Sequence, residues 1–216
     1  VYVHTGTYTE HVVINKSISV VGQDAVNTLI IPTSNGAAVR IVDDNVFLSG
    51  FTIVGRNAAG VEISGHSTDL DNITIDGVII ENTKGAGILV SGGADVHNLT
   101  VSNSSIHRNY EGIVVSSDHT NVYNFLLLNT EVNYNKNNGV VFKDKAKLYN
   151  PQLIDSDLSW NGDNGLLIDH AEIVGQLLLD GGPKNQNGEH GIYIKESSLG
   201  NFLVKDADVS FNEGSN

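Results

Sequence analysis

The 216-residue chain contains no cysteine, no methionine and only three prolines. Without cysteine, neither disulfides nor thiolate metal sites can form. Basic residues are also scarce, because 12 lysines and arginines stand against 25 aspartates and glutamates, for a formal net charge of −13. Phosphate binding needs a basic patch, and none is visible along the chain, so the composition argues against nucleic acid and anionic membranes as partners. No apolar run approaches the length that spans a bilayer, which argues against direct membrane insertion.

What the sequence does contain is a repeat with two markers. Six glycines, each followed by an apolar–x–apolar triplet, recur at a nearly constant interval: Gly60, Gly87, Gly112, Gly139, Gly165 and Gly191. Six asparagines recur in step with them: Asn82, Asn109, Asn135, Asn161, Asn187 and Asn212. A fixed period of this size, about 26 residues, indicates a stacked repeat architecture.

Each repeat contains three short stretches with the alternating pattern of a strand. The first follows the glycine. The second covers residues such as 73–75, 99–101, 125–127 and 202–204, and the third covers 106–108, 132–134, 158–160 and 209–211. With no helical periodicity, the pattern predicts an all-β fold of about eight coils of about 26 residues, stacked into three parallel sheets around one core. We expect a single domain over residues 1–216 that is a piece of a longer protein.

The two markers predict structural roles. Glycine and asparagine tolerate the restricted backbone angles of a tight corner, and stacked asparagine amides can bond from coil to coil. The aromatic series Tyr134, Trp160 and Phe211 shares its parity with the apolar residues two positions before each member, so we expect it to point inward as a core stack.

The N-terminal coil carries a further pattern, Gly6-Thr7-Tyr8-Thr9-Glu10 followed by an alternating apolar stretch. This opening and the repeats behind it resemble the right-handed parallel β-helix proteins of the pectin-lyase-like superfamily, including pectin methylesterases and a periplasmic copper-maturation family. The resemblance implies a right-handed, single-stranded parallel β-helix over the whole chain. The motifs that the family's esterases, hydrolases, epimerases and lyases carry are absent, so the resemblance implies no particular activity.

Carboxylates recur near one predicted corner, and adjacent coils would bring them about 5 Å apart. That spacing suits a Ca²⁺ ion or the carboxylate pair of a retaining glycosidase, although aspartate at a polar corner more often serves only the turn. The weak candidates for catalysis are Asp155, Asp157, Asp180 and Asp206. No metal site is expected from the histidines, of which His107 and His119 form the closest distinct pair.

An apolar row is expected on the outer face of the glycine-led sheet, where a solvated sheet would be polar. Its members are the middle residues of the triplets: Leu89, Val114, Val141, Leu167 and Tyr193. The second sheet carries Leu126, Leu178 and Leu203 in the same manner. We therefore expect a face covered by another copy, by a neighbouring segment of the same protein or by a ligand.

Three functions follow from these observations. The first is a non-catalytic structural or adhesive module of an extracellular or cell-surface protein, self-assembling through the apolar row, with other copies, neighbouring segments or glycans as partners. The second is a polysaccharide-acting lyase, epimerase or hydrolase with the acidic residues above. The third is a periplasmic metal-delivery module. No cofactor is expected apart from the Ca²⁺ alternative.

Overall fold

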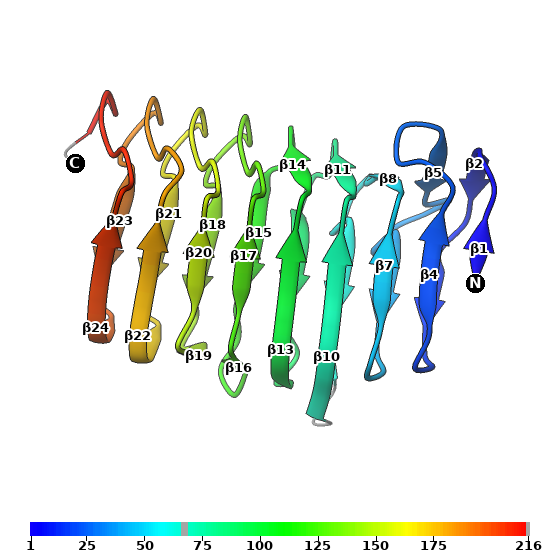
Figure 1. The fold of residues 1–216 in the computed structure, drawn as a ribbon, viewed down its shortest axis with the longest axis horizontal. Coiled ribbons are helices and arrows are strands. Elements are labelled where there is room, and N and C mark those ends of the chain that lie inside the picture. The colour runs from blue at the N-terminus through cyan, green and yellow to red at the C-terminus, as the bar shows by residue number, and fades with distance from the viewer. Residues whose placement is uncertain (66–68, 215–216) are drawn as a thin grey trace.

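The protein is a parallel β-helix in a computed structural model that describes residues 1–65 and 69–214. Short strands stack coil upon coil along one axis, with the N-terminus at one end and the C-terminus at the other (Figure 1). All the strand pairs are parallel and form three sheets, here called A, B and C. In the described residues no helix is long and apolar enough to cross a membrane. The predicted β-helix of about eight coils in three sheets is confirmed.

Sheet A is the widest and forms the face toward the viewer in Figure 1. Its strands are β1 (Tyr2–Val3), β4 (Ser19–Gly22), β7 (Phe47–Ser49), β10 (Asp69–Asp76), β13 (Asp95–Ser102), β16 (Asn121–Tyr123), β17 (Leu126–Leu128), β19 (Lys147–Tyr149), β20 (Gln152–Ile154), β22 (Glu172–Asp180) and β24 (Ser198–Lys205).

Sheets B and C close the coil. Sheet B consists of β2 (Gly6–Thr9), β5 (Thr28–Ile31), β8 (Thr52–Val54), β11 (Ile79–Glu81) and β14 (Ser105–His107). Sheet C consists of β3 (Val12–Ile14), β6 (Val39–Ile41), β9 (Val61–Ile63), β12 (Ala86–Val90), β15 (Glu111–Val115), β18 (Val140–Lys143), β21 (Leu166–Asp169) and β23 (Ile192–Lys195).

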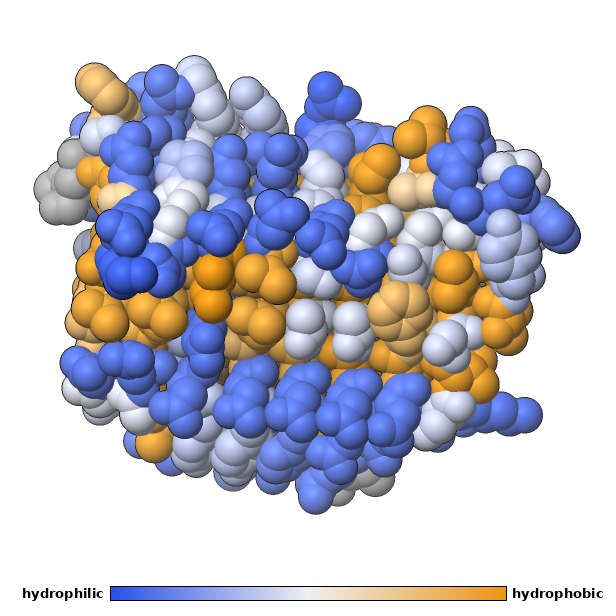
Figure 2. All heavy atoms as spheres, in the orientation of Figure 1, coloured by the Kyte–Doolittle hydropathy of each residue, from blue (hydrophilic) through white to orange (hydrophobic). Residues whose placement is uncertain are grey.

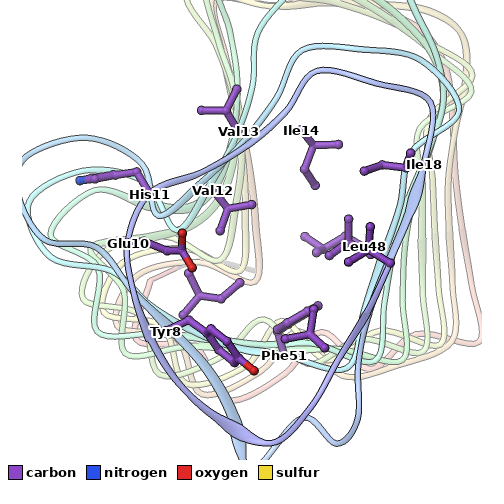
Figure 3. A pocket seen from close by; sticks show the side chains of 13 residues that line it. Tyr8, Glu10, His11, Val12, Val13, Ile14, Ile18, Leu48 and Phe51 are labelled. Carbon is purple, nitrogen blue, oxygen red and sulfur yellow. The ribbon is translucent and has the colours of Figure 1, made fainter.

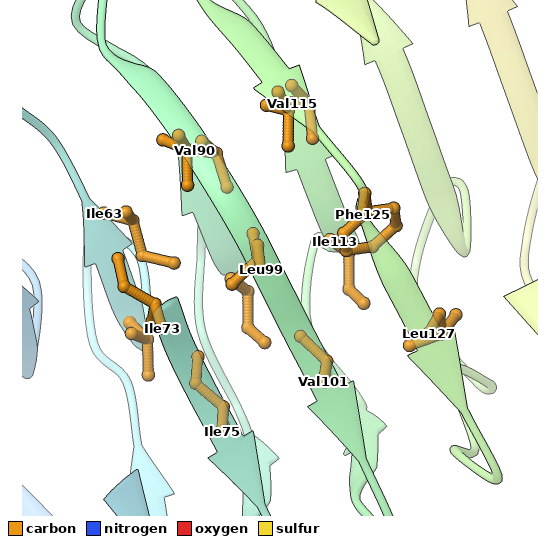
Figure 4. Packing of buried hydrophobic residues seen from close by; sticks show 14 of the residues in the cluster. Ile63, Ile73, Ile75, Val90, Leu99, Val101, Ile113, Val115, Phe125 and Leu127 are labelled. Atoms are coloured by element: carbon orange, nitrogen blue, oxygen red, sulfur yellow. The ribbon is translucent and has the colours of Figure 1, made fainter. Parts of the chain in front are cut away.

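The core is a set of apolar rows that run along the axis between the sheets. Ile63, Val90 and Val115 of sheet C face Ile73 and Leu99 of sheet A across the interior (Figure 4), and all five are fully buried. Alternate residues of each strand point inward, so the register repeats the same type of side chain in every coil. Burial of these rows is the main source of stability.

The repeat glycines are required by close approach rather than by backbone angle. A Cβ on Gly139 would lie 2.6 Å from the carbonyl oxygen of Gly165, and one on Gly112 would lie 2.3 Å from that of Gly139. None of the six has a positive φ. The part of the prediction that placed them in left-handed corners was therefore wrong. They leave room for the next coil.

The asparagine ladder is buried and bonded from coil to coil. The Asn135 side-chain oxygen accepts a hydrogen bond from the Asn109 backbone N–H at 3.0 Å, and its Nδ2 donates to Asn161 Oδ1 at 3.0 Å. Asn82 does not belong to it, because Asn82 is exposed with a φ of 59° and Thr83 stands in the ladder position. The interval between Asn82 and Asn109 is slightly longer than the next one because Asn82 lies one position before the ladder.

The inward placement of the three aromatic residues was wrong. Tyr134, Trp160 and Phe211 are 57%, 48% and 80% exposed, and each has a φ between 52° and 59°. A left-handed residue breaks the alternation of a strand, so parity counted from the preceding apolar residue fails at that point. After β14 the third strand is reduced to single bridges at Glu131, Asp157, Pro183 and Asp208.

Sheet A has an additional arm that the sequence pattern did not reveal. Strands β10 and β13 bend at a left-handed asparagine, Asn72 and Asn98 with φ of 55° and 56°, and a paired segment precedes each bend. The Nδ2 of Asn98 donates to Asn72 Oδ1 at 3.0 Å, and that of Asn124 donates to Asn98 at the same distance. A second, exposed asparagine ladder therefore runs along the outside of the bend.

Candidate functional site

The four aspartates proposed from the sequence occupy turns and strand ends. Asp155 and Asp206 are left-handed corner residues with φ of 48° and 49°. Asp157 Oδ1 accepts the Ser159 backbone N–H at 2.9 Å, as expected of an aspartate that caps a turn. Asp180 ends β22 and pairs with Lys205, whose Nζ lies 3.1 Å from Asp180 Oδ2.

Asp180 and Asp206 share a cationic partner. The Lys205 ammonium lies 3.4 Å from Asp206 as well, and its pKa is raised by the hydrogen bond and charge of Asp180 and then by Asp206. Across residues 1–65 and 69–214, no three histidine, aspartate or glutamate side chains are placed to hold a metal ion together. Calcium at the stacked corners stays a prediction.

The histidine pair considered for metal delivery is split between two sides of the coil. His107 ends β14 in sheet B, where its Nε2 lies 3.2 Å from Glu81 Oε2. His119 lies in the turn that follows β15 of sheet C. The two imidazoles therefore belong to different environments.

The apolar row of sheet C lies on the side away from the core, as its parity predicted. It forms a separate small cluster in which Val114 and Val141 are only 4% and 1% exposed. Leu89 and Leu167 are half-buried, and Tyr193 is 37% exposed. The centre of the predicted assembly face is thus already buried within this chain, and only its end is open.

A cluster that the sequence analysis missed lies at the corner between sheets B and C. We call it the cationic corner; it comprises Arg56, Lys84, Arg108, Lys136, Tyr110, Tyr134 and Trp160. All seven are exposed. Consecutive coils supply them, since the Lys84 N–H bonds to the Arg56 carbonyl and the Arg108 N–H to that of Tyr134. Four of the 12 basic residues of an acidic chain are therefore gathered on one corner.

The cationic corner is hollowed and its charges are largely free. A hollow of about 460 Å³ is lined by Lys84, Arg108, Tyr110 and Lys136 together with two ladder residues. Arg108 has a distant partner, with its Nη1 4.0 Å from Glu81 Oε2. Within the described chain no ion pair is formed by Lys84 or Lys136. Lys136 Nζ instead lies 5.4 Å above the Tyr110 ring, a cation–π distance.

Two aromatic rings extend this corner along the axis. The rings of Tyr134 and Trp160 are stacked, with centroids 5.9 Å apart and planes 15° apart. Large exposed aromatic side chains in left-handed positions are uncommon, because asparagine or glycine fits such turns at lower cost. Arg108, Tyr134 and Trp160 are equally spaced in the sequence, which indicates that they form one row. The sequence analysis did not find this row because it predicted that the two aromatic side chains point into the core.

A further aromatic row, on sheet A, offers only ring edges. His97, Tyr123 and Tyr149 stack face to face with centroids 4.3 Å apart at both steps. Their regular spacing, one ring in each coil, is visible in the sequence. Since each ring covers the face of the next, a ligand on the outside meets edges and hydroxyls rather than open faces. Burial raises the pKa of the Tyr123 hydroxyl, with a further contribution from Tyr149.

Two other surfaces are apolar. Figure 2 shows an apolar band across the outer face of sheet A between hydrophilic rows, and Leu126, Leu178 and Leu203 belong to the outward positions of this face. At the N-terminal end a hollow of about 410 Å³ opens into the core, where Ile14 and Leu48 point inward (Figure 3). Its lining is mostly apolar and also includes Tyr8, Glu10 and His11.

The chain belongs to the right-handed β-helix family, because the family model described as right handed beta helix region matches residues 17–174. The fold expected from the resemblance is confirmed. No curated protein matches the chain.

The chain is similar to two solved structures. The A-module of the mannuronan C-5 epimerase AlgE6 of Azotobacter vinelandii is 14% identical with a TM-score of 0.52, over 99% of this chain and 88% of the module. The A-module of the mannuronan C-5 epimerase AlgE4 of the same organism is 10% identical with a TM-score of 0.38, over 100% and 90%. At these identities the likeness is one of fold.

Proposed function

We propose that the protein is a non-catalytic, polysaccharide-binding module of an extracellular or cell-surface protein, and that it holds an acidic glycan at the cationic corner. The observation that carries the proposal is the concentration of Arg56, Lys84, Arg108 and Lys136 on one corner of a chain with a net charge of −13. Each of four successive coils presents one cation. A polymer with repeating carboxylates can meet several of them at once, which favours an extended acidic chain over a small anion.

The aromatic side chains of the same corner fit a sugar ligand. Tyr110, Tyr134 and Trp160 are about half exposed, and such amphipathic rings can pack against the C–H face of a pyranose while bonding its hydroxyls. The adjoining coils carry Asp163 and Glu189 instead of cations. Any anionic polymer would be repelled there, so the bound segment is confined to the four coils that carry the cations.

The proposal is tested by binding of defined oligosaccharides, measured by isothermal titration calorimetry. Oligogalacturonate hexasaccharide should bind, cellohexaose should bind at least tenfold more weakly, and added salt should weaken only the first. Lys84→Glu with Lys136→Glu should abolish binding. The matched control, Lys16→Glu with Lys205→Glu, makes the same charge change away from the corner and should bind within about twofold of the parent chain. Two results would contradict the proposal. One is tighter binding of a single-stranded oligonucleotide than of the acidic glycan, and the other is acidic glycan binding that Lys84→Glu with Lys136→Glu does not weaken.

The same material distinguishes binding from catalysis. Under this proposal the oligogalacturonate and an oligomannuronate are recovered unchanged, with no unsaturated or reducing ends released and no epimerised residue. Turnover that disappears in Asp155→Ala and Asp180→Ala chains would favour the polysaccharide-acting alternative instead.

Self-association is a second candidate, supported by the apolar band of sheet A (Figure 2). Leu203 on β24 is 42% exposed at one end of this face. Sedimentation velocity of the parent chain and of Leu126→Lys with Leu178→Lys tests it: assembly through this band predicts faster, concentration-dependent sedimentation that the variant loses.

A further inference from the structure

A groove adjoins the cationic corner on the sheet C side and shares one residue with it. It has a volume of about 370 Å³, and Tyr110 lines both this groove and the hollow of the corner. Its floor is apolar, being formed by Ala86, Leu89 and Val114, and all three side chains are buried or half-buried. A ligand held at the corner therefore meets an apolar, ring-sized depression directly beside it.

The polar rim of the groove is led by Glu111. Glu111 Oε2 accepts hydrogen bonds from the backbone N–H and the Nδ2 of Asn138 at 3.0 and 3.2 Å, and Oε1 lies 3.5 Å from the same Nδ2. Burial raises the pKa of this carboxyl, while Asn138 and the Lys143 charge act in the opposite direction. One carboxyl oxygen is held in place and the other retains capacity for a ligand hydroxyl.

The charges around the groove differ from those at the corner. Glu111 and Asp144 bring two carboxyls to the lining, and Lys143 brings one ammonium group. A sugar carboxylate placed here would face a net acidic rim, so the groove suits an uncharged pyranose whose C–H face covers the apolar floor and whose hydroxyls meet Glu111 and Lys143.

We propose that this groove is a subsite for a neutral pyranose, and that the ligand is a heteropolysaccharide in which an uncharged sugar adjoins an acidic one. The inference rests on the proposed function, since the corner holds the acidic neighbour. The cationic corner favours an acidic sugar, whereas the groove favours an uncharged one. A polymer that consists only of uronate matches the cationic corner but not the groove.

Titration calorimetry with two acidic hexasaccharides tests the subsite. A hyaluronan hexasaccharide alternates uronate with a neutral N-acetylhexosamine, whereas an oligogalacturonate hexasaccharide carries a carboxylate on every sugar. The parent chain should bind the alternating ligand about tenfold more tightly, the size of one hydrogen bond to a charged group. Glu111→Ala should remove this preference without weakening oligogalacturonate binding, because it removes a carboxylate that repels a uronate in the groove.

A second variant keeps the test independent of the Glu111–Asn138 contact. Ala58→Trp, on the half-buried rim, fills the groove and should erase the same preference. Equal or tighter binding of oligogalacturonate by the parent chain, or an equal loss for both ligands in the two variants, would overturn the subsite. Failure of the cationic corner itself has a different signature, namely that neither acidic hexasaccharide binds or that Lys84→Glu with Lys136→Glu has no effect.

Discussion

Lys184 stands in a core row that other coils fill with residues such as Leu158. Its side chain is fully buried, and its ammonium donates to the carbonyl oxygens of Gly181, Gly182 and Ser156 at 2.8, 3.0 and 3.3 Å. In the preceding coil Ser156 supplies the hydroxyl at the equivalent corner, bonded to the Ile154 carbonyl. Gly182 has no side chain to do so. The lysine therefore supplies the donor that this coil lacks.

The cost of that arrangement predicts a pH dependence. Burial lowers the pKa of Lys184 from 10.5 to about 8, against the opposing effect of the Asp157 and Asp155 charges. Between these values the unfolded chain binds more protons than the folded one, so this group makes the protein more stable as the pH rises from about 8 to 10.5. The gain is on the order of 3 kcal/mol.

Urea denaturation of the parent chain and of Lys184→Met across this pH range measures the effect. The difference between the two unfolding free energies isolates Lys184 from the surface lysines, which are present in both chains. A difference that does not change with pH would contradict the assignment of a depressed pKa.

At the scale of elements, the buried asparagine ladder acts as a fourth set of bonds between coils beside the three sheets. Asn135 makes bonds to Asn109 and Asn161, and its Nδ2 also donates to the Ile106 carbonyl at 3.2 Å. Replacing it by alanine leaves buried partners unpaired, each at a cost of about 1 to 3 kcal/mol.

Asn135→Ala should therefore lower the unfolding free energy by about 3 kcal/mol in denaturant titration. The matched control is Asn57→Ala, because Asn57 is exposed and its side chain donates to the exposed Asn35 at 2.7 Å. This substitution should change the unfolding free energy by less than about 0.5 kcal/mol. Equal effects of the two substitutions would show that the ladder contributes no more than a surface bond.

At the scale of elements, the sequence predicted where the glycine and asparagine rows lie, but not why the structure requires these residues there. The period placed the glycine and asparagine rows, and their backbone bonds agree with the register of sheet C. The period did not show which marker residue has a left-handed backbone. That residue is the one before each ladder asparagine, such as Trp160 before Asn161, and the resulting reversal of side-chain direction turned an expected core stack into an exposed one.

At the scale of the molecule, each coil contacts only its neighbours, so stability is a sum of coil and interface terms. Tyr2 near one end of the stack and Phe202 near the other are 60% and 38% exposed, whereas the central strands β15 and β18 are largely buried. Hydrogen exchange should therefore be slowest in central strands such as β15 and β18 and faster in β2 and β24. Mass spectrometry of peptides from each coil checks this. A single rate for all the coils would mean that the β-helix opens only as a whole.

The glycine and asparagine intervals by themselves determined the stacked β-helix, its coil length and its apolar rows, because a solenoid repeats local sequence at a constant distance. They did not determine what meets at a corner. Arg56, Lys84, Arg108 and Lys136 are separated from one another by about one coil each in a chain of net negative charge, and only stacking brings them to one corner with Tyr110. Whether a residue joins the core or the surface there depends on one left-handed backbone angle, which composition and period leave open and the packing of successive coils decides.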